Sequence, residues 1–210
     1  MRKQQREAIL ALLEETYMGT ETALNYSTPF ELLVAVIMSA QCTDERVNKI
    51  TARIFPKYNT PEKMGALSQE QLEEEIRDCG LFRSKAKNLL ATCKMLTEEY
   101  NSVIPDTVEE LMKLPGVGKK TANVVASIVY KVPAIAVDTH VFRVSHRLGL
   151  AKGDDPLAVE KELQKAIPKN KWSDAHHWLI WHGRKVCKAR KPVCSECVLV
   201  ELCPYKEKNL

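Results

Sequence analysis

Apolar residues recur along the chain at intervals of three and four, which is the period of an α-helix with one buried face. No segment alternates apolar and polar residues in the manner of a half-buried strand. The periodic segments are Ile9–Leu13, Leu32–Met38, Val47–Ile54, Leu72–Ile76 and Leu89–Leu96. The pattern predicts an all-α fold of many short helices, followed by an irregular tail that carries cysteines.

Helix-start signals agree with this pattern. Short polar side chains accept hydrogen bonds from the free N–H groups of a first helical turn, and proline fits the first helical position. Such signals are Ser27 and Thr28 ahead of Pro29, Ser68 ahead of Gln71, and Asp106 ahead of Glu109. We expect helices to begin at these places.

The stretch LPGVGKKTA, residues 114–122, separates two predicted helices, Asp106–Leu114 and Lys120–Tyr130. Its two glycines permit backbone angles that other residues resist, so the turn can expose consecutive N–H groups at the positive end of the second helix. Such groups bind phosphate. The candidate contacts are Gly116, Val117, Gly118 and Lys119. A purely structural hairpin between two helices fits the same residues.

The two adjacent lysines suggest two different roles. Lys119 can remain exposed as a phosphate partner, whereas Lys120 faces a different direction on the helix. A lysine amine is a nucleophile only when neutral, and a free lysine side chain has a pKa of ~10.4. Burial or neighbouring positive charge, including a helix N-terminus, lowers that pKa. The turn therefore offers both a phosphate clamp and a place to activate an amine.

Asp138 precedes a third helical pattern in PAIAVDTHVFRVSHRLGL, residues 133–150. The simpler interpretation is an N-cap, in which the carboxylate accepts backbone N–H groups of the first turn. A carboxylate held at a helix start can also stabilise developing positive charge or handle a proton. His140 lies beside it in the sequence, either as an ordinary surface histidine or as part of a binding pocket.

Four of the seven cysteines fall in the last segment, with the spacing C-x6-C-x2-C-x5-C from Cys187 to Cys203. The two between them are Cys194 and Cys197. Four thiolates so close in sequence can enclose zinc or a [4Fe–4S] cluster, and general rules of spacing do not decide between them. Closing the first loop around a metal would order the cations Lys188, Arg190 and Lys191 into a phosphate-binding surface.

Composition narrows the class of protein. With 210 residues, 45% of them hydrophobic, the chain can bury a core without disulfides. The net charge is +4, but residues 184–191 hold five cations and no anion, which suggests a polyanionic partner. The longest uncharged run, Leu32–Thr43, is shorter than the ~20 residues that span a bilayer. Without a recognisable signal peptide, we expect a soluble monomer in a bacterial or archaeal cytoplasm, associated with the nucleoid and not with a membrane.

The segments LPGVGKKTANVV and AVDTHVFRVSHRLGL together resemble the helix-hairpin-helix and Gly/Pro-Asp signature of DNA glycosylases. The lysine in the hairpin and all three cysteine intervals are similar to those of the endonuclease III family. This resemblance implies a two-lobed helical fold, with one domain at residues 22–132 and a second formed by residues 1–21 and 133–210. It also implies a [4Fe–4S] cluster on the four cysteines.

The resemblance further implies a bifunctional DNA glycosylase and AP lyase of base excision repair, acting on oxidised or saturated pyrimidines and abasic sites in duplex DNA. Lys120 matches the nucleophile that forms a Schiff base, and Asp138 matches the catalytic carboxylate. The segments SAQCTDERVN and DCGLFRSKA also resemble the family, where Gln41 and Leu81 match side chains inserted into the duplex. His140 would line the base pocket.

Three other functions fit part of the same sequence. An adenine-mismatch glycosylase shares the hairpin, aspartate and cluster, but it usually lacks the lysine and uses a glutamate from the early helix, and Leu32–Thr43 contains no acidic residue. A non-catalytic helix-hairpin-helix module explains the hairpin and the cysteines without chemistry. A small electron carrier explains the cysteines alone.

Overall fold

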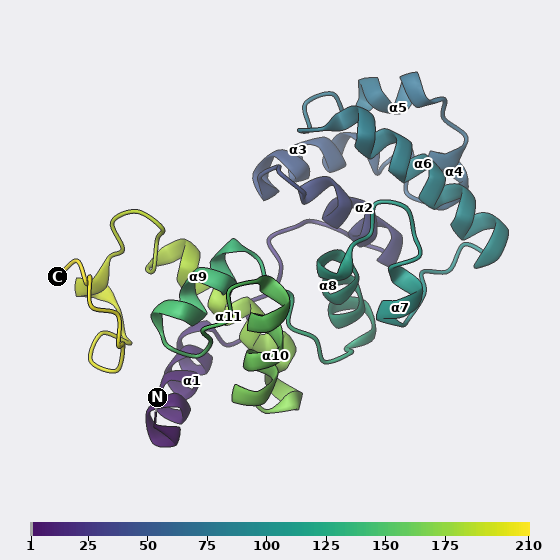
Figure 1. The fold of residues 1–210 in the computed structure, drawn as a ribbon. Coiled ribbons are helices and arrows are strands. Elements are labelled where there is room, and N and C mark those ends of the chain that lie inside the picture. Colours follow the sequence, from purple (N-terminus) through teal and green to yellow (C-terminus); the bar gives the residue numbers. More distant parts are fainter. Residues whose placement is uncertain (1) are drawn as a thin grey trace. The chain divides into compact units, whose positions relative to one another are not determined.

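The computed structural model describes residues 2–210, and every regular element among these residues is a helix (Figure 1). The predicted all-α class is therefore confirmed. The chain divides into two compact units: the central unit, Ala23–Tyr130, and the terminal unit, which joins the residues up to Thr22 with Lys131–Leu210. No helix among residues 2–210 is both long and apolar enough to cross a lipid bilayer.

The central unit consists of seven helices linked by short turns. They are α2 Pro29–Ser39, α3 Asp44–Ile54, α4 Pro61–Gly65, α5 Gln69–Glu75, α6 Phe82–Glu99, α7 Val108–Leu111 and α8 Lys119–Tyr130. Helix α2 packs against α3, α6 and α8, and every residue from Phe30 to Met38 is buried. An amphipathic surface helix buries one face, so α2 is instead the core around which this unit is built.

The terminal unit brings the two ends of the chain together. Its helices are α1 Lys3–Tyr17, α9 Thr139–Arg147, α10 Pro156–Ala166 and α11 Trp172–Lys185, with 3₁₀ turns at Lys169–Lys171 and Cys194–Glu196. Helix α11 packs against both α1 and α9, and α10 packs against α9. Leu13, Val144, Leu163 and Leu179 contribute one fully buried side chain from each helix to their shared core.

The predicted helix starts are confirmed at two of three places. Thr28 accepts a hydrogen bond from the Glu31 N–H, 3.1 Å away. Ser68 forms a capping box in which its backbone N–H donates to Gln71 Oε1 while the Gln71 N–H donates to Ser68 Oγ. At the third place the cap is Thr107 and not Asp106. Thr107 has extended backbone angles, and its Oγ1 accepts the Glu110 N–H of α7 at 3.2 Å.

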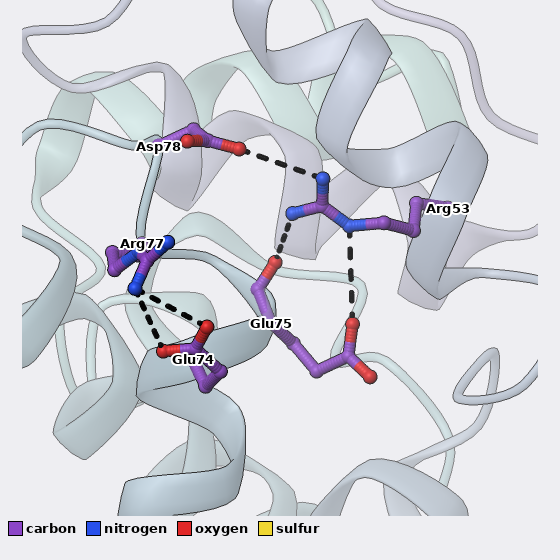
Figure 2. A network of polar contacts seen from close by, with 5 residues as sticks. All are labelled: Arg53, Glu74, Glu75, Arg77 and Asp78. Atoms are coloured by element: carbon purple, nitrogen blue, oxygen red, sulfur yellow. Dashed lines mark hydrogen bonds and ion pairs between the residues drawn. The ribbon is translucent and has the colours of Figure 1, made fainter.

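Arg53 of α3 holds the chain where α5 ends (Figure 2). Its guanidinium donates to the carbonyl oxygen of Glu75 at 2.6 Å and pairs with Asp78 at 3.4 Å and the Glu75 carboxylate at 3.9 Å. Arg77 and Glu74 form a separate exposed pair at 3.4 Å. Exposed ion pairs contribute little to stability, but the bond to a terminal helix carbonyl satisfies an acceptor that has no partner within the helix. The turn that leads to Leu81 is thereby tied to α3.

Candidate functional site

The predicted hairpin is present as α7, a turn and α8. Gly116 has φ of +77°, and a Cβ atom there would lie 2.8 Å from Asn88 Nδ2 and 2.9 Å from Asn88 Cβ. Gly118 has open space around the same position and no left-handed φ. The sequence predicted that the two glycines permit unusual backbone angles, and Gly116 is the one that takes a left-handed angle in this turn.

The hairpin turn is anchored from within the central unit. Thr92 Oγ1 donates to the Pro115 carbonyl oxygen at 2.8 Å, and the Val117 N–H donates to the Leu114 carbonyl oxygen at 3.1 Å. Val117 is buried, whereas Gly116, Gly118 and Lys119 are exposed. The buried Val117 side chain thus fixes the turn to the central unit while the residues on either side of it remain exposed.

Helix α8 begins directly after this turn. Its first intrahelical bond runs from the Ala122 N–H to the Gly118 carbonyl oxygen at 3.0 Å, so the N–H groups before it have no partner within the helix. Lys120 is exposed at the second position of α8. The amine is therefore exposed to solvent, at the positive end of α8 and beside Lys119.

Asp138 is the N-cap of α9, as the simpler interpretation predicted. Its Oδ1 accepts the Val141 N–H at 2.7 Å, and the side chain is half-buried. One carboxylate oxygen is thus engaged by the backbone, which fixes where the other one lies. Because N-capping orients the group without neutralising it, capping and carboxylate chemistry are compatible at this residue.

His140 lies two residues further along, in the first turn of α9. Its Nδ1 is 3.1 Å from Arg143 Nη2. Burial lowers the pKa of His140, the Asp138 carboxylate opposes this, and the Arg143 and Arg184 guanidinium groups lower the pKa further. The ring is therefore held neutral near pH 7, as a hydrogen-bonding group rather than a cation.

Gln41 and Leu81 both take left-handed backbone angles that non-glycine residues rarely adopt. Their φ values are 53° and 60°, and both residues are exposed, Leu81 by 56%. The two turns touch, because a Cβ atom on Gly80 would lie 2.9 Å from the Gln41 carbonyl oxygen. Exposed side chains on strained backbone are typical of functional positions, since packing alone does not explain the strain.

The basic loop, residues 188–191, is held by two arginines that sequence analysis did not identify. Arg147 donates to the carbonyl oxygens of Lys188 at 2.7 Å and Ala189 at 3.1 Å, and Arg143 donates to that of Cys187 at 3.1 Å. Lys188, Arg190 and Lys191 are exposed. Since α9 supplies both arginines, the loop is fixed to a helix and presents its cations in one arrangement.

The four tail cysteines line one pocket, together with Arg147, His182 and Tyr205. All four are half-buried, and burial raises the pKa of the Cys197 and Cys203 thiols, with their neighbouring thiols adding to the effect. Among residues 2–210, no three His, Cys, Asp or Glu side chains converge on a single ion. Four soft thiolate donors around one pocket fit an iron–sulfur cluster.

His182 supports this pocket from α11. Burial lowers its pKa to about 4, so the ring is neutral. Its Nε2 lies 3.8 Å from Cys197 Sγ, and its Nδ1 lies 3.1 Å from the Tyr17 hydroxyl oxygen of α1. Sequence analysis did not single out His182, because the link to Tyr17 spans 165 residues.

Comparisons with known proteins decide the family. Residues 34–169 match the HhH-GPD superfamily of base excision DNA repair proteins, and residues 187–203 match the iron-sulfur binding domain of endonuclease III. Endonuclease III of Rickettsia prowazekii (strain Madrid E) is 50% identical over 205 residues, which is 98% of this chain and 97% of the relative. The chain belongs to the endonuclease III family.

Two further endonuclease III proteins show the same relation. The protein of Escherichia coli (strain K12) is 48% identical over 208 residues, 99% of each chain. A solved structure of a trapped endonuclease III–DNA covalent intermediate, an estranged-adenine complex, is 51% identical with a TM-score of 0.93, covering 97% of this chain and 96% of that one. The similarity in sequence and in fold thus extends over nearly the whole chain.

Membership of the endonuclease III family confirms the predicted function, a bifunctional DNA glycosylase and AP lyase of base excision repair. It also confirms DNA binding and the [4Fe–4S] cluster. The adenine-mismatch glycosylase and the non-catalytic binding module are not favoured.

The two hairpin glycines provide a matched pair of substitutions. We expect Gly116→Ala to lower the free energy of unfolding by about 1–3 kcal/mol, because the new methyl group meets Asn88 and φ is left-handed. Gly118→Ala should change it by less than about 0.5 kcal/mol, since nothing lies within 4 Å. Urea denaturation of both variants checks this, and equal losses would contradict the assigned turn geometry.

Proposed function

We propose that this enzyme removes oxidised or saturated pyrimidines from duplex DNA, with Lys120 as the nucleophile. The observation that carries the proposal is the place of Lys120, exposed in the first turn of α8 directly after the anchored hairpin turn. A phosphate held at the N-terminal end of α8 would bring the sugar of a neighbouring nucleotide within reach of a side chain on the same helix turn.

Lys120 would act through covalent catalysis. The neutral amine attacks C1′ of the damaged nucleotide. The glycosidic bond between C1′ and the base nitrogen breaks, and the base leaves with the electron pair of that bond. One proton of the lysine nitrogen passes to the departing base; the C1′–O4′ bond then breaks, O4′ takes up a proton, and the C1′–N bond to lysine becomes a protonated Schiff base. Loss of a C2′ proton then drives β-elimination, which breaks the C3′–O3′ bond and cuts the strand on the 3′ side. Because C1′ is hidden in a duplex, the nucleotide must first be flipped out.

Asp138 would supply the carboxylate for this chemistry. Developing positive charge on the sugar is stabilised by a nearby anion, and a carboxylate can also move a proton to or from the departing groups. The N-cap bond to the Val141 N–H supports the proposal because it fixes the carboxylate before substrate arrives. A neutral His140 beside it suits hydrogen bonding to a flipped base.

DNA would be held by contacts that carry no sequence information. We assign contacts with the DNA phosphate backbone to the exposed hairpin residues Gly116, Gly118 and Lys119, which the buried Val117 supports. The cations Lys188, Arg190 and Lys191 would bind a second stretch of backbone. Gln41 and Leu81 would enter the duplex at the lesion, filling the gap and separating the strands. These contacts suit an enzyme that finds damage in any sequence.

The four tail cysteines would hold the [4Fe–4S] cluster of the family. Residues 187–203 contain only two buried side chains, Pro192 and Leu199, so the segment has almost no core of its own. The cluster, when bound, supplies four iron–thiolate bonds that cross-link the segment. We assign it the structural task of fixing the basic loop.

The acting species would be a monomer. The exposed large hydrophobic side chains in the described part of the chain are scattered in sequence, which supports a protein that works alone: Met18, Leu81, Val103, Met112, Leu157, Val198 and Leu210. We propose that its partner is duplex DNA with damaged bases or abasic sites, in a bacterial or archaeal cytoplasm. The central and terminal units would act as the two domains of the enzyme.

Lys120→Gln tests the nucleophile. With duplex DNA that contains one oxidised pyrimidine, we expect the unsubstituted chain to form a covalent adduct on borohydride treatment and Lys120→Gln to form none. Strand cleavage should fall by about three orders of magnitude or more, because the Schiff base is lost. Lys119→Gln is the matched control and should weaken DNA binding while leaving the adduct. An adduct that persists in Lys120→Gln would remove this lysine from the mechanism.

Asp138→Asn separates capping from catalysis. Asparagine caps helices about as well as aspartate, so the melting temperature should stay within a few degrees of the unsubstituted value. Base excision should slow about 10²–10⁴-fold, because the anionic charge and the proton acceptor are lost. Thermal denaturation and single-turnover excision measure the two effects. Unchanged excision would show that Asp138 is a cap and nothing more.

Cys197→Ser tests the cluster ligands. We expect loss of iron, loss of visible absorption and a lower melting temperature, because serine does not replace a thiolate toward iron. The control is Cys42→Ser, a half-buried cysteine outside the tail, which should keep its full iron content. Iron and sulfide analysis of the purified proteins gives the result. Full iron occupancy in Cys197→Ser would exclude this cysteine as a ligand.

A further inference from the structure

Lys85 of α6 is a buried charged residue that the proposed chemistry does not use. Its exposed fraction is 4%. Its Nζ donates to the carbonyl oxygens of Met38 at 2.8 Å and Ala40 at 2.6 Å, and to Cys79 Sγ at 3.1 Å. A lysine ammonium has three N–H groups, and here each has one acceptor. The buried ammonium group is thus fully hydrogen-bonded, through acceptors from two separate segments of the chain.

The acceptors explain why a charge is tolerated there. Met38 and Ala40 lie at the C-terminal end of α2, where the final carbonyl groups lack helical partners and the helix dipole favours a cation. Burial raises the pKa of the Cys79 thiol and the Lys85 ammonium opposes this, with burial the larger effect. Cys79 Sγ accepts the lysine N–H at 3.1 Å and itself donates to the Met38 carbonyl oxygen at 3.3 Å.

The same three bonds join the two strained turns. Ala40 directly precedes Gln41, and Cys79 stands two residues before Leu81. Gly80 lies between them with its Cα against the Gln41 carbonyl group, where a side chain would not fit. One ammonium group thus ties the end of α2, the turn with Gln41 and the turn with Leu81 into a single body. Arg53 also bonds to Asp78, the residue before Cys79, at 3.4 Å (Figure 2).

We propose that Lys85 is a positioning residue that keeps Gln41 and Leu81 in the conformation that enters duplex DNA at a lesion. Left-handed backbone at a residue other than glycine is unfavourable and persists only where the surroundings impose it. Without the ammonium group, the carbonyls of Met38 and Ala40 lose their buried donor and the two turns relax separately. The inference rests on the proposed insertion of Gln41 and Leu81.

Lys85→Met tests the proposal, because methionine has a similar shape and no donor. Lys87→Met is the matched control, since Lys87 lies two residues away on α6 and is exposed. The probe is a duplex with a non-cleavable abasic-site analogue opposite 2-aminopurine, whose fluorescence rises when the base loses its stacking. We expect Lys85→Met to bind this duplex about 10–100-fold more weakly than the unsubstituted chain, without the fluorescence rise. Lys87→Met should resemble the unsubstituted chain.

Two comparisons separate positioning from a general loss of structure. Affinity of Lys85→Met for undamaged duplex, and its borohydride adduct with a single-stranded abasic oligonucleotide, should stay within about twofold of the unsubstituted values, because neither needs the turns to enter a duplex. If Lys85→Met does not fold, Lys85→Leu serves instead, since leucine also lacks a donor. Normal fluorescence and lesion affinity in either folded variant would overturn the proposal.

The insertion itself is checked with Gln41→Ala/Leu81→Ala. If this double variant loses the fluorescence rise, adding Lys85→Met to it should cause no further loss, because residues that act through one step are not additive. If the double variant keeps the rise and Lys85→Met loses it, the insertion assignment fails and Lys85 acts on another group, which overturns the proposal as stated. Lys120→Gln should show the full fluorescence rise, because the assay does not depend on the nucleophile. The assay therefore tests the insertion independently of whether Lys120 is the nucleophile.

Discussion

A helix that is buried on every side must find protein hydrogen-bond partners for the N–H and C=O groups at its two ends, because water does not reach them. Helix α2, the core of the central unit, is such a helix. Its residues Phe30–Met38 are all buried. At its N-terminal end the Thr28 side chain accepts the Glu31 N–H, and at its C-terminal end Lys85 donates to two carbonyl oxygens. Because α3, α6 and α8 pack on this helix, the turns that meet DNA in our proposal start from fixed positions.

The proposed functional segments have one feature in common: a neighbouring helix holds each strained or irregular stretch of backbone in place. The hairpin turn lies against Asn88 of α6 at Gly116, and Thr92 of the same helix donates a hydrogen bond to the Pro115 carbonyl oxygen. In the terminal unit, Arg143 and Arg147 of α9 hold the loop of the tail cysteines. Support of this kind lets exposed amines, amides and cations keep one arrangement, so little ordering is left to occur when DNA binds.

Sequence analysis predicts well what is decided by near neighbours. The helical period, the Ser68 capping box and the Asp138 cap involve residues within four positions of one another, and the structure has all of them. Lys85 could not be identified in this way, because its acceptors on α2 lie 45 and 47 residues away. The same holds for Arg147, whose partners are 41 and 42 residues distant. Periodicity also cannot tell which of the two hairpin glycines takes a left-handed angle, and in the structure it is Gly116.

The central claim is that the amine of Lys120 forms the bond to the sugar. The most direct measurement is protease digestion of the borohydride-trapped protein–DNA adduct, followed by tandem mass spectrometry of the modified peptide. Our account predicts that the sugar remnant is on Lys120 and that the adjacent Lys119 is unmodified. A remnant on Lys119, on another lysine or on the N-terminal amine would contradict it.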